Sequence, residues 1–86
     1  MNLRTTKFFD KEYSKITHHN PILSKKIKKQ LLLLVQNPKH PSLRFHKLSP
    51  SSYWSVSIDK SIRVIVVLEK DWVAATHIGK HEDVYN

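Results

Sequence analysis

The amino-acid sequence predicts a small α+β domain in which a helical hairpin packs on a mainly antiparallel sheet, with its elements in the order β-α-α-β-β-β. The chain has 86 residues, enough for one modest hydrophobic core and therefore for a single domain over residues 1–86. Apolar residues between positions 7 and 36 recur at helical spacing, whereas those from Tyr53 onward alternate with polar ones. This change of period places both helices before most of the sheet.

The N-terminal segment predicts a short strand followed by a helix. Leu3 and Thr5 alternate with polar neighbours, as in a strand. The hydroxyl of Thr6 is suited to cap the helix that follows. The apolar residues of that helix are spaced four and three apart along one stripe: Phe9, Tyr13 and Ile16.

The second helix has clear start and stop signals. Asn20 followed by Pro21 is typical of a cap and a first helical position, and Asn37 followed by Pro38 ends the run. The apolar side chains of this helix share one face: Leu23, Ile27, Leu31 and Leu34. The other face carries a cluster of lysines: Lys25, Lys26, Lys28 and Lys29. The hairpin therefore has a cationic outer side.

Three strands are predicted after the helices, over residues 53–58, 64–68 and 72–78. In the first of them, Trp54, Val56 and Ile58 should face the core, while Ser55, Ser57 and Asp59 point to an open face. Gly79 is expected to turn the chain with a positive φ after the last strand. The residues expected to be largely buried are Phe9, Ile27, Leu31, Trp54 and Val66.

Charge and composition narrow the classes of function. Fifteen Lys and Arg against seven Asp and Glu give a net charge of +8, which favours an anionic partner. The absence of cysteine excludes disulfides and thiolate metal sites. The longest apolar run, residues 31–35, is far shorter than a membrane span, and no secretory signal pattern is visible. We therefore expect a cytoplasmic protein without a membrane partner.

Two segments that flank the predicted strands carry a family resemblance. The sequence NPKHPSLRFHKL at positions 37–48 and IGKHEDVY at positions 78–85, with the strand sequences YWSVSI and RVIV between them, resemble the RelE/ParE toxin superfamily. The resemblance spans essentially the whole chain. It implies a β-α-α-β-β-β domain, the toxin of a type II toxin–antitoxin system, a cognate acidic antitoxin, and cleavage of mRNA on the ribosome. It also implies that operator DNA is bound only through the antitoxin.

The resemblance also assigns candidate catalytic residues. In metal-free RNA cleavage the substrate's own 2′-hydroxyl attacks the adjacent phosphorus, so the protein must accept a proton, stabilise negative charge and protonate the leaving oxygen. Histidine can act as either acid or base near neutral pH, and arginine binds phosphate with a planar set of donors. Aligned with the YafQ-like branch, the catalytic positions are His46, Arg63, His81 and Tyr85. No metal or other cofactor is expected.

Further basic residues are expected to bind RNA phosphates: Arg44, Lys47, Lys25, Lys28 and Lys29. The chain also departs from the YafQ-like branch, which would have a histidine and an aspartate near Ser57 and Ser61. A serine hydroxyl can bind phosphate but is a poor acid or base at neutral pH. The predicted site therefore has fewer acid–base groups than the site of the YafQ-like branch.

Simpler roles exist for the same residues. His46 fits equally well as a polar residue at the start of a strand, and Arg63 as the partner of Glu82 or Asp83 in a salt bridge. His77, inside the last strand, is interpreted as structural. The alternative function is a non-catalytic one, either a ParE-like gyrase inhibitor or a decayed toxin that only binds its antitoxin.

Overall fold

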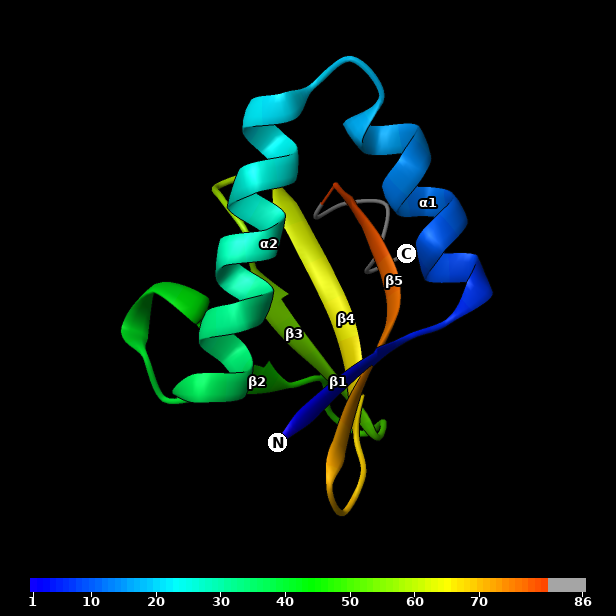
Figure 1. The fold of residues 1–86 in the computed structure, drawn as a ribbon. Helices are drawn as coiled ribbons and strands as arrows, with labels where there is room; N and C mark the ends of the chain where they lie inside the picture. Colours follow the sequence, from blue (N-terminus) through cyan, green and yellow to red (C-terminus); the bar gives the residue numbers. More distant parts are fainter. Residues whose placement is uncertain (81–86) are drawn as a thin grey trace.

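The protein forms two helices packed on a five-stranded sheet (Figure 1). The structure is a computed structural model, and it describes residues 1–80. Its elements are β1 Asn2–Thr5, α1 Lys7–Thr17, α2 Pro21–Gln36, the 3-10 helix η1 Pro41–Leu43, β2 His46–Lys47, β3 Tyr53–Ser57, β4 Ile62–Leu68 and β5 Trp72–Lys80. The strand order is β1-β5-β4-β3-β2, and only β1 and β5 are parallel. The predicted α+β class and element order are confirmed, with β2 as an additional strand of two residues.

The helix boundaries are those that the capping residues predict. The Thr6 hydroxyl accepts a hydrogen bond from the Phe9 backbone N–H at 3.0 Å. Asn20 Oδ1 accepts one from the Leu23 N–H at 3.1 Å, with Pro21 in the first helical position. These caps satisfy N–H groups that have no partner within the helix. Among the described residues, neither helix has the length and hydropathy needed to cross a membrane.

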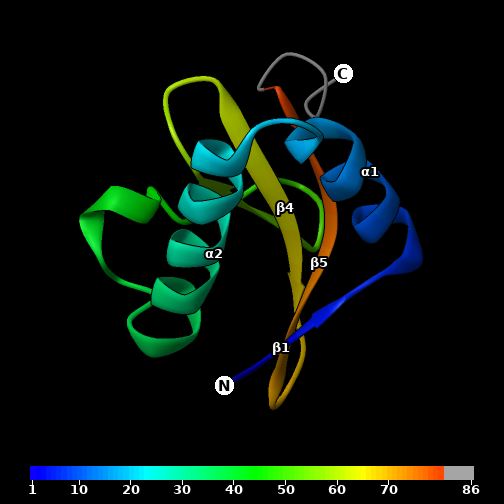
Figure 2. The same cartoon turned by 45° about the horizontal axis from the view of Figure 1, so that its top comes forward.

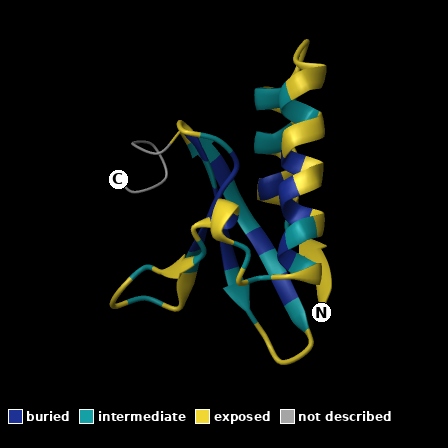
Figure 3. Cartoon of the chain, turned by 90° about the vertical axis from the view of Figure 1, so that its left-hand side faces the viewer, coloured by how far each residue is buried: buried dark blue, intermediate teal, exposed yellow. Residues whose placement is uncertain are grey.

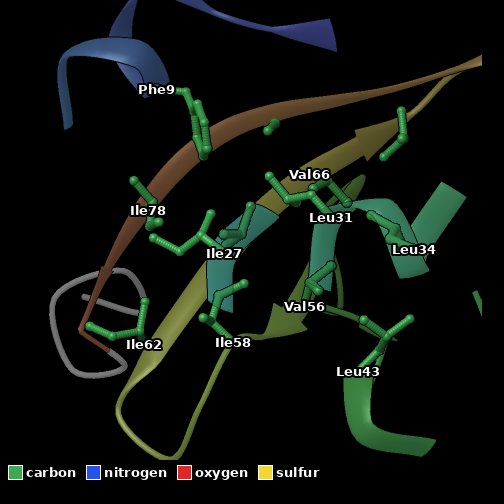
Figure 4. Close-up of a cluster of buried hydrophobic side chains, with 13 residues drawn as sticks. Phe9, Ile27, Leu31, Leu34, Leu43, Val56, Ile58, Ile62, Val66 and Ile78 are labelled. Atoms are coloured by element: carbon green, nitrogen blue, oxygen red, sulfur yellow. The ribbon is translucent and has the colours of Figure 1, made fainter. Parts of the chain in front are cut away.

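The core lies between α2 and one face of the sheet (Figure 4). Ile27, Leu31 and Leu34 of α2 meet the valines of β3 and β4 that share this face. Figure 3 shows the inner side of α2 buried and its outer side exposed. Phe9, Ile27, Leu31 and Val66 are buried as predicted. Trp54 is only half-buried, because it lies near the sheet edge, where its ring stacks on Phe45 with centroids 4.7 Å apart.

Helix α1 is held along the edge of β5, and the two lie side by side in two views (Figures 1 and 2). β1 pairs with β5 only from Trp72 to Ala75. Beyond that point, Glu12 Oε1 accepts a hydrogen bond from the Ile78 N–H at 3.2 Å. A side chain of α1 therefore takes the place of a strand partner on this part of β5.

Two sequence predictions about the open side of the sheet are wrong. Gly79 has no positive φ, because β5 continues to Lys80 and Gly79 pairs with Arg63 inside the ladder. Ser55 and Ser57 do lie on the face opposite the helices, but they are 0% and 7% exposed. Alternation alone does not reveal how far that face is covered.

A buried glutamine closes the opposite edge of the sheet. β2 pairs with β3 only at Trp54 and Ser55, so the edge of β3 beyond these residues has no neighbouring strand. Gln30 Nε2, on α2, donates to the Ser57 carbonyl at 2.9 Å and to the Ser42 carbonyl at 3.4 Å. A buried carbonyl without a partner would cost about 1–3 kcal/mol. Gln30 therefore joins α2, η1 and β3.

Replacing Leu31 with alanine should lower the free energy of unfolding by about 2–5 kcal/mol, because the change opens a cavity between α2 and the sheet. The neighbouring Leu32 is the matched control, since it is 56% exposed whereas Leu31 is 7% exposed. Leu32→Ala should change stability by about 0.5 kcal/mol or less. Urea denaturation of both variants measures the difference, and equal midpoints would contradict the packing described.

Candidate functional site

The open face of the sheet carries two histidines in one cross-strand row. His46 pairs with Ser55, Ser55 with Ile65, and Ile65 with His77. Their neighbours along the strands, such as Val56, belong to the core beneath the helices. Because side chains alternate between the two faces of a strand, this row points away from the helices. We call these four residues the histidine row.

The His46 side chain is oriented by the backbone before it. Its Nδ1 lies 2.8 Å from the Arg44 carbonyl oxygen. A carbonyl can only accept, so Nδ1 carries the hydrogen and Nε2 of the neutral ring keeps its lone pair. Arg44 adopts a left-handed conformation, φ 44° and ψ 42°, as the chain leaves η1. His46 is exposed, and when its ring is neutral this tautomer leaves Nε2 free to accept a proton, as a general base must.

His77, interpreted from the sequence as structural, lies at the other end of the histidine row. Its ring is held edge-on by Phe8 of α1 and Tyr53 of β3, with centroids 5.0 Å and 6.4 Å away. The Thr76 hydroxyl donates to the Ile65 carbonyl, so it accepts from His77 Nδ1, which is 3.0 Å away. The neutral ring again carries its lone pair on Nε2. The sequence analysis did not assign His77 to the site; its alternation with Ile78, a core residue, is the sequence signal that could have placed it on the open face.

A groove of about 960 Å³ runs from α1 around β5 onto the open face. Its wall includes two aromatic rings, one histidine and three lysines: Phe8, Tyr53, His77, Lys11, Lys15 and Lys80. We call it the open-face groove. Glu12 also lines it, with Oε1 bonded to the Ile78 N–H. The lysines give the groove the charge that a phosphodiester chain requires.

Arg63 does not join the two histidines. It belongs to the next row of the open face, paired with Ser57 and Gly79. Its Nη1 donates to the Asp59 carbonyl and, at 3.1 Å, to the Ile62 carbonyl. The guanidinium is therefore drawn toward the turn between β3 and β4. Glu82 and Asp83, the partners of Arg63 in the alternative salt bridge, lie outside the described residues.

The serines at the positions where the family branch would have an acid–base pair are engaged in that same turn. Ser57 Oγ donates to the Asp59 carbonyl at 3.1 Å, and Ser61 Oγ donates to Asp59 Oδ1 at 3.2 Å. Asp59 Oδ1 also accepts the N–H groups of Ser61 and Ile62, both at 2.8 Å. The two hydroxyls therefore stabilise the turn.

The same turn changes the acidity of Asp59. Burial by itself would raise the pKa of its carboxyl. Hydrogen bonds from Ser61 and Ile62, and the positive charge of Lys26, act in the opposite direction and hold the pKa of Asp59 below its usual value. The ionised Asp59 carboxylate therefore stabilises the turn.

The remaining predicted residues are dispersed. Arg44, Lys47, Lys25, Lys28 and Lys29 are all exposed. Lys47 pairs with Trp54, which places it on the helix side of the sheet. His81 and Tyr85 lie outside the described residues. Within residues 1–80, no three His, Asp or Glu side chains are grouped so that they could hold a metal ion.

Comparison with solved structures identifies the fold. No family model matches the sequence, and no curated protein matches it. The toxin in the Escherichia coli DinJ–YafQ toxin–antitoxin complex is 17% identical with a TM-score of 0.80, and the match covers 99% of this chain and 97% of that one. A YoeB/ParE toxin from Agrobacterium tumefaciens is 16% identical with a TM-score of 0.80, covering 94% and 99%. A metal-bound toxin from Helicobacter pylori is 17% identical with a TM-score of 0.81, covering 98% of both chains.

These similarities extend over nearly the full length of both chains. The protein therefore has the RelE/ParE-like toxin fold, and the resemblance found in the sequence is confirmed at the level of the fold. At this identity the comparison defines architecture, and function has to be argued from the site.

The Asp59 carboxyl predicts a pH dependence of stability. Because its pKa is lowered in the folded state, Asp59 stabilises the fold above its unfolded pKa of about 3.9, and this contribution is lost as the pH falls through the folded pKa. Asp59→Asn keeps an acceptor oxygen but cannot titrate. The stability difference between wild type and Asp59→Asn should be constant from pH 5 to pH 7 and shrink below about pH 4. Denaturation across this range measures it, and a difference independent of pH would contradict the assignment.

Proposed function

We propose that this protein is the toxin of a type II toxin–antitoxin pair and acts as a metal-independent endoribonuclease on mRNA at the ribosome. The observation that carries the proposal is the histidine row, which presents His46 and His77 on the open face next to a groove lined by lysines. Paired proton-transfer groups on an exposed cationic surface are what RNA cleavage needs. Solved neighbours of the same fold are toxins, one of them in complex with its antitoxin.

The proposed reaction uses the RNA's own 2′-hydroxyl as nucleophile. A histidine Nε2 accepts the proton of that hydroxyl, whose oxygen forms a bond to phosphorus. The bond between phosphorus and the 5′-oxygen breaks, and a second, protonated histidine donates a proton to the leaving oxygen. The products are a 2′,3′-cyclic phosphate and a 5′-hydroxyl, with no external oxidant or metal.

His46 and His77 are three strands apart in the row, a backbone separation of about 14 Å at about 4.8 Å per strand. Ser55 and Ile65 lie between them and are 0% and 4% exposed, so the surface between the two histidines is formed by the side chains that cover this part of the row. His81 and Tyr85, which the family resemblance assigns, complete the proposed set: His81 takes part in proton transfer and Tyr85 positions the nucleotide. Lys11, Lys15 and Lys80 in the open-face groove, with Arg63 beside it, bind the phosphates.

We also propose an acidic antitoxin as the protein partner. A chain of charge +8 with an exposed cationic groove attracts a carboxylate-rich segment, and such a segment would cover the open face. The related E. coli toxin was solved with an antitoxin bound. Operator DNA would then be contacted through the antitoxin.

A second candidate function is a toxin without RNA cleavage, either a ParE-like gyrase inhibitor or a protein that only binds antitoxin. One observation favours it: Ser57, Ser61 and the Arg63 guanidinium are engaged within the β3–β4 turn. A toxin that only binds its target would not need a proton-transfer pair. The histidine row supplies such a pair. This contrast favours the nuclease.

Primer extension on an mRNA translated in vitro tests the proposal. Wild-type protein should cut the translated message and leave the same message intact without ribosomes. His77→Ala should slow cleavage by about 10²-fold or more, the usual contribution of a general acid or base. His81→Ala should abolish cleavage, and His46→Ala should have a milder effect.

His18→Ala, at the exposed end of α1, is the matched control and should cleave like wild type. A gyrase supercoiling assay runs beside the cleavage assay. Inhibited supercoiling without any cut message would replace the nuclease by the second candidate function. Full cleavage by the His46→Ala/His77→Ala double variant would remove the histidine row from the site.

A further inference from the structure

A second groove lies on the far side of the sheet from β5. It has a volume of about 840 Å³ and is bounded by α2, η1 and the turn between β3 and β4. Its charged wall residues are Lys26, Lys29, Arg44, Lys60, Arg63 and Asp59. We call it the corner groove. It shares no wall residue with the open-face groove.

The corner groove is strongly cationic. Five of its charged wall residues are positive and one, Asp59, is negative. The Asp59 carboxylate oxygen already accepts three hydrogen bonds within its turn, from Ser61 N–H, Ser61 Oγ and Ile62 N–H. Three elements that are distant in sequence each contribute cations, so the charge belongs to the folded groove and not to one lysine-rich helix.

Buried hydrogen bonds fix the walls of the groove relative to one another. Gln30 Nε2 bonds to the Ser57 and Ser42 carbonyls, which joins the helix wall to the β3 wall and to η1. Arg63 bonds to two carbonyls of the turn. Walls joined in this way, with the Arg63 guanidinium already held in place, lose less conformational entropy when the groove binds an anion.

An aromatic pair continues the groove. A neighbouring hollow of about 530 Å³ shares His40, Pro41 and Arg44 with the corner groove, and Phe45 and Trp54 form part of its wall. The two rings are stacked, with centroids 4.7 Å apart and planes 19° from parallel. Proteins that bind single-stranded nucleic acid combine a cationic groove along the backbone with aromatic rings on which bases stack.

We propose that the corner groove and the Phe45–Trp54 pair bind single-stranded RNA at a site that shares no wall residue with the open-face groove. The lysines and Arg44 contact phosphates, and a base rests against the aromatic pair. Carboxylates of an acidic peptide would match the cations but would leave the aromatic pair unused, so RNA fits both features. The inference shares with the proposed function the ligand class, RNA, and one residue, Arg63, which lies in the wall of the corner groove. It concerns binding and needs no cleavage.

Fluorescence anisotropy with a labelled 2′-O-methyl oligouridylate of 12 nucleotides tests this site. The 2′-O-methyl groups prevent cleavage, so binding is measurable whether or not the protein is a nuclease. Lys26→Gln/Lys29→Gln should weaken binding about tenfold near 0.1 M salt. The slope of log K against log salt should become less steep by about 1.4, because each lost phosphate contact on a single strand accounts for about 0.7.

Lys7→Gln/Lys70→Gln is the matched control, because it removes the same charge from exposed lysines outside both grooves. It should change affinity less than about twofold. Equal losses in the two double variants would show a general charge effect and overturn the proposal. Arg44→Gly is a second test that spares the fold, since glycine readily adopts the left-handed conformation of Arg44. Unchanged affinity in Arg44→Gly would also overturn the proposal.

Oligoglutamate of 12 residues represents the alternative ligand class, an acidic polypeptide. Because both ligands use the cations, Lys26→Gln/Lys29→Gln should weaken RNA binding as well as oligoglutamate binding, whereas Phe45→Leu, which removes one ring of the aromatic pair, should weaken RNA binding alone. If only oligoglutamate binding fell, the groove would belong to an acidic polypeptide and the RNA assignment would be wrong.

Discussion

Gln30 holds together the parts of the molecule on which its surface chemistry depends. β2 is too short to complete the edge of β3, and the Gln30 amide supplies the missing donor to the Ser57 carbonyl while also bonding to Ser42. This fixes η1, and with it the left-handed Arg44 whose carbonyl orients His46. One buried side chain thus connects the corner groove to the histidine row.

β5 plays the corresponding role on the other side of the sheet. It is paired with β1 and β4, and α1 extends its edge through Glu12. The alternation of side chains along β5 buries Ile78 and brings His77 to the open face, where Phe8 and Tyr53 contact its ring. β5 therefore both completes the core and places His77 on the open face.

Local signals in the sequence predicted the fold well, because caps and periodicity act within a few residues. Thr6, Asn20 and Pro21 define the helix starts. In the apolar stripe of α2, Leu23 is partly buried and the other three residues are buried as expected. The site was harder to predict because it depends on register between strands. The pairing of His77 with Ile65 and the attraction of Arg63 to the turn carbonyls both arise from tertiary contacts. The prediction of a positive φ at Gly79 was wrong for the same reason, because pairing with Arg63 keeps the strand extended there.

Cleavage of RNA through its own 2′-hydroxyl, as we propose for the histidines of this protein, leaves characteristic ends on the two fragments. The chemical identity of the cut ends tests it most directly, by mass spectrometry of the fragments from a translated message. The proposed reaction leaves a 2′,3′-cyclic phosphate, or the 3′-phosphate formed from it, on the upstream fragment and a 5′-hydroxyl on the downstream fragment. A 3′-hydroxyl with a 5′-phosphate would contradict it, because those ends require attack by water, as in metal-assisted hydrolysis.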